Sequence, residues 1–475
     1  MPILLACYWL CGSRSRNLLL LGASLFFYTW GEGWYVLLLL ISIVVNYTLG
    51  VFVDKQREQA NGRRFVWLAV IFNLGILIWC KYDVFFVGSL NQFLSQFTVD
   101  LFPAQSRYLP LGISFFTFQA LAYILDVYRG NVAAHLSLPR FALFMAMFPK
   151  IAAGPIIRYS EVADDMPERM FDKELFSSGV KRFVIGLGKK VLIADTIAKT
   201  ADQVFAIPAP ELTTGIAWLG IACYTLQIYF DFSGYSDMAI GLGRMLGFRI
   251  RENFNYPYMA RSLTDFWRRW HISLSTWFRD YLYIPLSYAL MTDNIRQKIV
   301  AGKYKTNYRN LFSIIVVFVL CGLWHGVGWT FVVWGLLHGL VLCLESLWLE
   351  KTVKKLWVPL QHVYLLLVVM LSWVLFRTAS IMDATAYYKA LLGFTPTASG
   401  QYRLALFMDN ELLLTLAVGI ICTTSISQNI ACFLEAEWLQ KYASLLEIAV
   451  FILILLSSFA VLASSTFSPF IYQQF

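Results

Sequence analysis

Residues 310–340 read NLFSIIVVFVLCGLWHGVGWTFVVWGLLHGL, a stretch that is apolar almost throughout and yet contains histidines. An apolar run of about 20 residues is long enough to cross the roughly 30 Å hydrocarbon core of a bilayer. Comparable runs predict membrane-embedded segments at 17–30, 34–53, 65–80, 109–125, 183–198, 214–230, 311–324, 329–349, 357–376, 411–427 and 445–463. Several are shorter than a full span, so we expect about ten to twelve embedded helices, some short or re-entrant.

The composition of the whole chain agrees with a membrane environment. Hydrophobic residues make up 59% of the 475 residues and charged residues only 14%, with a mean hydropathy of +0.62. A soluble domain of this length needs far more charge on its surface. No repeat or linker composition divides the sequence, so we expect one all-α integral membrane domain over residues 1–475.

The cysteines and the N-terminus exclude several other protein classes. The eight cysteines lie singly, mostly in apolar runs, and the close pair Cys7 and Cys11 has no matching second pair. This pattern indicates neither a disulfide framework nor a metal site. Met1 is followed directly by an apolar run, without a basic segment before it or a cleavage pattern after it, so we do not expect a secretory signal peptide.

Positive charge predicts the orientation in the membrane. Residues 244–309 contain twelve Lys and Arg residues but only four Asp and Glu residues. The segment 53–64 is also basic, and Arg14 and Arg16 precede it by one hairpin. Because basic residues in short loops stay in the cytoplasm, we expect residues 55–64 and 293–309 to face that side.

A second informative stretch is FWRRWHISLSTWFRDYLYIPL at 266–286. Read as one helix, it places Asp265, Arg268, His271, Ser275 and Arg279 on one face and aromatic residues on the other. Such a helix could lie in the membrane interface, with its arginines among the lipid headgroups. A weakly charged imidazole contributes little to that role, so His271 points instead to a functional site.

His325 lies deeper in the sequence of an apolar segment. Fourteen residues (311–324) precede it, and a helix entering from the basic side would carry it roughly 21 Å inward at about 1.5 Å per residue. Gly322, Gly326 and Gly328 remove side-chain bulk around it, so a neighbouring backbone or a thin substrate can approach. A structural hydrogen bond between helices is the alternative, but ionisable groups at such depth more often mark function.

The remaining polar residues in apolar surroundings are interpreted as structural. We expect His338 to be a structural histidine, and His135 and His362 to lie in loops or at helix ends. Asp231 and Asp237, in FDFSGYSD, are expected to satisfy backbone groups or each other.

The two histidine segments together resemble the membrane-bound O-acyltransferases, in particular the bacterial branch that includes the alginate O-acetylases. Three further segments resemble that family in the same order, and the resemblance covers roughly residues 10 to 380. They are LPLGISFFTFQALAYILDVYRG (109–130), MFPKIAAGPIIRYSE (147–161) and YFDFSGYSDMAIGLGRMLGFRIRENFNYPY (229–258).

The resemblance implies a ring of helices around a funnel-like interior, to which an acyl thioester comes from the cytoplasm and a hydroxyl acceptor from the other side. His325 would be the catalytic general base, and His271 would orient the donor or its thiolate. An imidazole titrates near neutrality and so suits proton transfer. Arg268, Arg269, Arg279 and Ser275 are the candidates for donor binding, because coenzyme A carries phosphates that guanidinium groups attract.

The resemblance also implies the substrates and partners. The donor would be acetyl-CoA, with no bound cofactor, and the acceptor a secreted polysaccharide, alginate or alginate-like, with peptidoglycan or cellulose as alternatives. An extracytoplasmic, serine-hydrolase-like acetyltransferase and the secretion machinery would be partners in a bacterial inner membrane, and nucleic acid would not. Two other classes remain open: a transporter of an acyl group, which broken helices and midplane polar residues would suit, and a non-catalytic scaffold of a secretion complex.

Overall fold

The computed structural model describes residues 1–95, 109–134, 137–290, 308–395, 402–426, 440–464 and 470. Throughout these ranges the regular structure is helical, with no β-strand, so the predicted all-α class is confirmed. Contacts divide the chain into two compact units, the first made of residues 1–183 and 238–251 and the second of residues 184–237 and 252–475. The expectation of one membrane domain over the full length stays a prediction.

Each predicted apolar segment overlaps a helix, although residues 109–112 precede theirs and residue 427 lies outside the described residues. Within the described ranges, five helical segments are long and apolar enough to cross a membrane: Ser15–Gln56, Ala60–Tyr82, Trp329–Val353, Val358–Arg377 and Leu445–Ser464. Shorter apolar helices occupy Ile113–Tyr128, Asn310–His325 and Asn410–Cys422. The prediction that some embedded segments would be too short for a full span is therefore confirmed.

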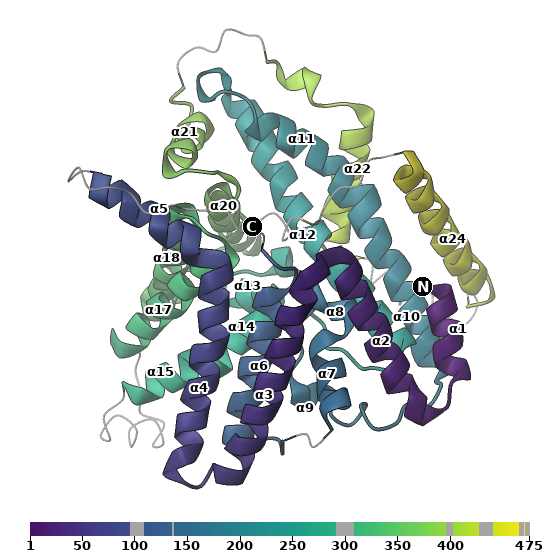
Figure 1. Ribbon diagram of the computed structural model, residues 1–475. Helices are drawn as coiled ribbons and strands as arrows, with labels where there is room; N and C mark the ends of the chain where they lie inside the picture. Colours follow the sequence, from purple (N-terminus) through teal and green to yellow (C-terminus); the bar gives the residue numbers. More distant parts are fainter. Residues whose placement is uncertain are drawn as a thin grey trace. The chain divides into compact units, whose positions relative to one another are not determined.

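The first unit contains a helical hairpin formed by α2 and α3. The helices of this unit are α1 (Pro2–Leu10), α2 (Ser13–Glu32), α3 (Val36–Gln56), α4 (Ala60–Leu77), α5 (Asp83–Leu94), α6 (Ile113–Tyr128), α7 (Leu138–Ala146), α8 (Phe148–Ile151) and α9 (Tyr159–Val162). The chain reverses between α2 and α3 at Gly33, whose φ of +56° is a left-handed conformation that glycine adopts without strain. In Figure 1 both helices run downwards from this turn and diverge, so their outer ends lie on the same side of the turn but apart.

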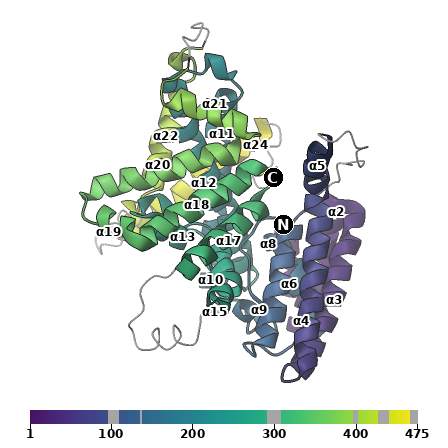
Figure 2. The same cartoon turned by 90° about the vertical axis from the view of Figure 1, so that its left-hand side faces the viewer.

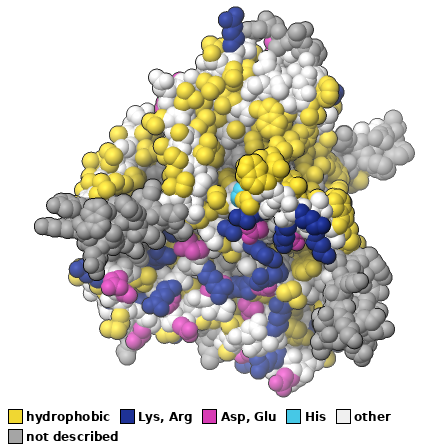
Figure 3. Space-filling model, turned by 180° about the vertical axis from the view of Figure 1, so that it is seen from behind, with side chains coloured by type: hydrophobic (Ala, Val, Ile, Leu, Met, Phe, Trp, Pro, Cys, Tyr) yellow, Lys and Arg dark blue, Asp and Glu magenta, His cyan; other side chains and the backbone are white. Residues whose placement is uncertain are grey.

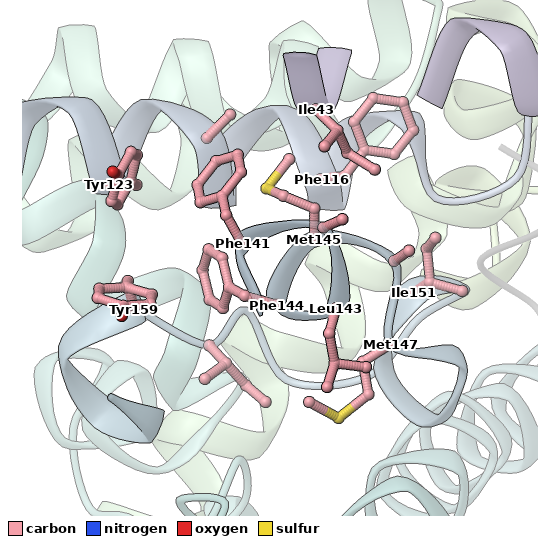
Figure 4. Packing of buried hydrophobic residues seen from close by; sticks show 14 of the residues in the cluster. Ile43, Phe116, Tyr123, Phe141, Leu143, Phe144, Met145, Met147, Ile151 and Tyr159 are labelled. Carbon is pink, nitrogen blue, oxygen red and sulfur yellow. The ribbon is translucent and has the colours of Figure 1, made fainter. Parts of the chain in front are cut away.

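An aromatic cluster forms the core of the first unit. The ring of Tyr123 on α6 lies 4.7 Å from Phe141 on α7 and 5.5 Å from Tyr159 on α9, measured between ring centroids. Figure 4 shows these rings facing one another together with Phe144. Aromatic pairs at such separations stabilise a core by about 0.5–1.5 kcal/mol beyond the burial of their area. The cluster therefore joins α6, α7 and α9, which follow one another closely in the sequence.

The second unit contains the helices that carry the histidine segments. They are α11 (Asp195–Phe205), α13 (Leu263–Arg269), α14 (Ile272–Phe278), α15 (Ile284–Ala289), α17 (Tyr308–His325), α18 (Trp329–Leu344), α20 (Val358–Arg377), α21 (Ile381–Leu391), α22 (Asn410–Cys422) and α24 (Gln440–Ser464). Helices α10 (Lys173–Gly188) and α12 (Thr214–Met245) contribute to both units. Figure 2 shows α18 beside α20.

Glycines set the contact between α17 and α18. A Cβ atom at Gly322 would lie 2.2 Å from the carbonyl oxygen of Phe331, and one at Gly335 would lie 2.2 Å from the carbonyl oxygen of Phe318. No larger side chain fits at these positions, so the two backbones touch. The prediction that small residues near His325 admit a neighbouring backbone is confirmed for Gly322.

Large apolar side chains remain exposed on the surface. Hydrophobic side chains cover much of the face in Figure 3, and Lys and Arg side chains gather in one band on it. Trp30 and Trp34, at the turn of the first hairpin, are 82% and 86% exposed. Exposed tryptophans at the end of an apolar hairpin are typical of the membrane–water interface.

The turn between α3 and α4 offers a test of orientation. A cysteine replacing Gln59 should resist an impermeant maleimide applied to intact spheroplasts, because we expect residues 55–64 to face the cytoplasm. Gly62 is a poor position, since a Cβ there would lie 2.4 Å from the carbonyl oxygen of Gln56. Gly31→Cys, at the opposite end of the hairpin and with free space around it, is the matched control and should be labelled. The reverse labelling pattern would overturn the orientation.

Candidate active site

The stretch expected to form one helix over 266–286 is broken in the middle. Helix α13 ends at Arg269, α14 starts at Ile272, and a π-helical turn (Arg279–Tyr283) precedes α15. Between α13 and α14 the backbone is extended at Trp270 and left-handed at His271, with φ of +43°. The prediction of a continuous amphipathic helix is therefore wrong, and His271 does not lie on a helical face with Arg268.

Residues 253–255 hold this break by pairing with its backbone. The carbonyl oxygen of Asn253 accepts a hydrogen bond from the N–H of Ile272 at 2.9 Å, and its side-chain oxygen accepts one from the N–H of Ser273 at 3.0 Å. The N–H of Asn255 donates to the carbonyl oxygen of Arg269 at 2.9 Å. Helix ends leave backbone groups without partners, and here a neighbouring extended segment supplies them.

His271 is enclosed completely. It is 0% exposed, and its Nδ1 atom lies 3.3 Å from the side-chain oxygen of Asn253. The ring of Phe232 meets the imidazole edge to face at 4.6 Å. His271 lies outside the helices long enough to span a membrane, and burial lowers its pKa to about 3 because desolvation disfavours the imidazolium. The imidazole is therefore neutral near pH 7.

His325 is the last residue of α17 and is also buried, at 3% exposure. Its ring contacts Trp324 at 4.9 Å, Trp334 of α18 at 5.1 Å and Phe376 of α20 at 5.2 Å. The ring of Trp324 also lies 6.1 Å from that of His271. The structure therefore places both predicted histidines near the ring of one tryptophan, Trp324.

A cavity of about 660 Å³ is lined by residues that precede and follow these histidines along the chain, although neither His271 nor His325 lines it. Arg268 of α13, Ser275 of α14 and Arg279 line it, together with apolar residues of α17 that include Phe318 and Cys321. Cys321 precedes His325 by one helical turn, so the inner part of the cavity approaches the histidine along α17. Three of the four predicted donor-binding residues thus share one cavity.

Arg269 is the residue that this cavity does not include. Its Nε atom donates to both carboxylate oxygens of Asp265 at 3.0 Å, and both residues line a separate polar cavity of about 450 Å³. Adjacent residues of a helix point in different directions. Arg268 and Arg269 consequently face different spaces.

Sequence reasoning did not identify Glu345, which anchors α13. Its carboxylate accepts hydrogen bonds from the N–H of Leu263 at 2.7 Å and the N–H of Thr264 at 2.8 Å. The hydroxyls of Thr264 and Tyr364 donate to it at 2.7 and 3.0 Å. An acidic residue within the apolar run that follows His338 was a usable signal, because such carboxylates are costly unless they are paired.

His338 reinforces the same anchorage. The indole N–H of Trp267 on α13 donates to Nδ1 of His338 at 3.2 Å. Trp334, His338 and Glu345 are spaced by four and seven residues, so they share one face of the helix that begins as α18. Through His338 this face contacts Trp267 of α13, and through Glu345 it contacts the start of α13.

The aspartates of FDFSGYSD lie in ion pairs. Lys190 contacts Asp231 at 2.5 Å and Asp195 at 2.8 Å, and Lys189 contacts Asp237 at 2.7 Å. We had expected these aspartates to satisfy backbone groups or each other, and their lysine partners were not anticipated. The pairs join α12 to the π-helical turn (Lys189–Ala194) and stabilise the second unit.

The other predicted positions are peripheral or lie outside the described residues. His362, near the start of α20, has its Nδ1 atom 3.1 Å from the carbonyl oxygen of Ala260, which agrees with a place near a helix end. His135 and most of the segment 293–309 lie outside the part of the chain that the structure describes.

Paired histidines next to a cavity with guanidinium groups, in an all-helical membrane fold, are features of a membrane acyltransferase. Residues 24–384 match the model of the MBOAT, membrane-bound O-acyltransferase, family. The chain belongs to this family and is an O-acyltransferase.

Comparison with individual proteins gives the same result. Over 395 residues, covering 83% of this chain and 76% of the relative, the sequence is 43% identical to the probable alginate O-acetylase AlgI of Azotobacter vinelandii. It is 38% identical over its full length to the protein of that name from Pseudomonas putida, 98% of which is covered. A peptidoglycan O-acetyltransferase of Helicobacter pylori is 35% identical over 83% of this chain and 78% of its own length.

The anchorage of α13 predicts the effect of Glu345→Gln. The amide offers one acceptor oxygen where the carboxylate offers two, so buried donors lose partners at about 1–3 kcal/mol each. We expect a clearly lower midpoint of thermal unfolding for the purified protein in detergent. Glu350→Gln, on the same helix, removes only an exposed pair with Lys354 and should change the midpoint little. Equal midpoints for the two variants would contradict the anchoring role.

Proposed function

We propose that this protein passes an acetyl group from cytoplasmic acetyl-CoA to the outer side of the membrane, for O-acetylation of a secreted polysaccharide, alginate or alginate-like. The observation that carries the proposal is a cavity with Arg268 and Arg279 whose lining residues Ile272 and Cys321 lie next to His271 and one helical turn before His325, two histidines that both contact Trp324. The names of the relatives favour alginate, and that of the Helicobacter pylori protein keeps peptidoglycan as a second acceptor.

The cavity suits the two chemical parts of the donor. Arg268 and Arg279 have exposed side chains, and planar guanidinium groups bind phosphates through paired hydrogen bonds. The apolar lining from α17, with Phe318 and Cys321, accommodates the thin pantetheine arm of the coenzyme. The thioester then enters along α17 toward His325, and Ser275 offers a hydroxyl beside the arm.

His325 is proposed as the general base. Its imidazole accepts the proton of the acceptor hydroxyl while the hydroxyl oxygen attacks the thioester carbon. A C–O bond forms, the C–S bond breaks, and the proton leaves on the thiol of coenzyme A. The neutral imidazole of His271, held by Asn253, orients the donor or its thiolate.

The proposed topology follows from the direction of acyl flow. The protein would lie in a bacterial inner membrane, where the donor is cytoplasmic and the polymer is outside. An extracytoplasmic, serine-hydrolase-like acetyltransferase would receive the acetyl group and place it on the polymer. The alternatives of a transporter or a scaffold need no general base, so dependence on His325 separates them from an acetyltransferase.

The first test concerns His325→Ala. Loss of a general base typically lowers the rate about 10²- to 10⁴-fold, so we expect the ester content of the secreted polymer to fall to background while the protein still accumulates in the membrane. His271→Ala should also lower it, though less completely. His362→Ala, a histidine away from the cluster, is the control and should leave acetylation near normal. Near-normal acetylation with His325→Ala would refute the assignment.

The second test concerns the partner. The purified membrane protein with acetyl-CoA should release free coenzyme A slowly and acetylate little polymer, until the extracytoplasmic partner is added. Thiol release and polymer-bound acetyl can be measured in the same reaction. Efficient acetylation of intact polymer by the membrane protein alone would contradict the relay, although it would leave the acyltransferase unaffected.

A further inference from the structure

The hydrogen bond from Trp267 fixes the tautomer of His338. An indole nitrogen can only donate, so Nδ1 of His338, 3.2 Å away, must be the acceptor. A neutral imidazole that accepts at Nδ1 carries its proton at Nε2. His338 is 1% exposed, and its Nε2 atom has no hydrogen-bond partner among the described residues. It is therefore a buried N–H donor that lacks an acceptor.

Trp334 presents a second donor of the same kind. Its side chain is 0% exposed, and within the described part of the chain its indole nitrogen also has no partner. The rings of Trp334 and His338 lie 4.6 Å apart, one helical turn from each other on α18. An unsatisfied buried donor is costly, and nearly all such groups in native proteins have a partner. Two neighbouring donors therefore indicate an oxygen atom that binds between or beside them.

The position of the pair indicates which oxygen this is. Trp334 contacts the ring of His325 at 5.1 Å. Trp267, which lines the cavity, lies 5.5 Å from His338 and 6.0 Å from Trp334. Neither donor lines the cavity, but Trp334 contacts both Trp267 of its wall and the proposed base, and His338 lies beside Trp334. An acyl group that entered along α17 and reached His325 would bring its carbonyl to these donors.

We propose that the indole N–H of Trp334 and the Nε2–H of His338 bind the carbonyl oxygen of the donor thioester. The inference rests on the proposed function and adds two catalytic residues to it. When the acceptor oxygen attacks the carbonyl carbon, the C=O π electrons move onto this oxygen, and the two N–H groups stabilise the negative charge. When the C–S bond breaks, the carbonyl re-forms and the sulfur leaves with the proton held by His325. Donors fixed in advance at an oxyanion typically contribute about 10²- to 10³-fold each to the rate.

The competing explanation is a resident water molecule. A buried water makes about three hydrogen bonds to polar groups that otherwise lack partners. A water with only a structural role would affect stability, but it would not distinguish a ligand with a carbonyl from one without. The test must therefore compare two ligands that differ in the carbonyl alone.

Two analogues of acetyl-CoA supply this comparison. One is the ketone in which a methylene replaces the thioester sulfur and the carbonyl is kept; the other is the same sulfur-free analogue with a methylene in place of the carbonyl. Their dissociation constants are measured by calorimetry on the purified full-length protein in detergent. The variants are Trp334→Phe, which keeps an aromatic ring, and His338→Leu. Trp218→Phe makes the same substitution at a tryptophan whose indole N–H already donates to the carbonyl oxygen of Leu391 and serves as the control.

The wild type should bind the ketone more tightly than the analogue without the carbonyl. Trp334→Phe and His338→Leu should each reduce this preference by about two- to tenfold, the range of one hydrogen bond, while Trp218→Phe should keep it. His325→Ala should keep the preference while losing turnover, which separates this inference from the assignment of the base. Unchanged preference in Trp334→Phe and His338→Leu would overturn the inference and leave the proposed function standing. If neither analogue bound the wild type, both would fall.

Discussion

The break in the backbone at Trp270 and His271 is the constraint on which the site depends. If the helix continued, His271 would share a face with the arginines and be open to the same surroundings. The break turns the imidazole into an enclosed space against Phe232 and Trp324. It persists because residues 253–255 satisfy the backbone groups on both sides of it. A left-handed residue that is not glycine is strained, and such strain persists only where the surroundings fix it.

The helix that begins as α18 extends this control to the rest of the site. Along one face it contacts His325 through Trp334, Trp267 through His338, and the start of α13 through Glu345. Each contact sets the position of a group next to the cavity. Because polar groups buried in an apolar interior are costly unless paired, these contacts also limit the alternative arrangements of α13. The helix that begins as α18 thus determines where the seven-residue helix α13 presents Arg268.

The sequence predicted the embedded segments because long apolar runs have few alternatives to a helix in a bilayer. The sequence also marked His325 as a candidate site residue inside an apolar segment, because its apolar surroundings and neighbouring glycines are local signals. The break at His271 was missed because helical periodicity treats every residue as helical, and neither glycine nor proline marks this position. Its cause lies some eighteen residues earlier, at Asn253. Arg269 was grouped with Arg268 by charge, but adjacent helical residues point apart, and only the structure showed which of them faces the cavity. The partners of Glu345, Asp231 and Asp237 lie far from them in the sequence, so no local pattern specifies which residues they contact.

The central claim is that the donor thioester lies in the cavity between α13, α14 and α17. A photoreactive coenzyme A thioester, with a diazirine on a short acyl group, tests it most directly when the crosslinked residues of the purified protein are mapped by mass spectrometry. The account predicts adducts within residues 264–283, 314–325 and 334–346, which line the cavity or carry the proposed base and carbonyl donors, and their loss when excess acetyl-CoA is present. Adducts confined to other segments, or adducts in these segments that acetyl-CoA does not displace, would contradict it.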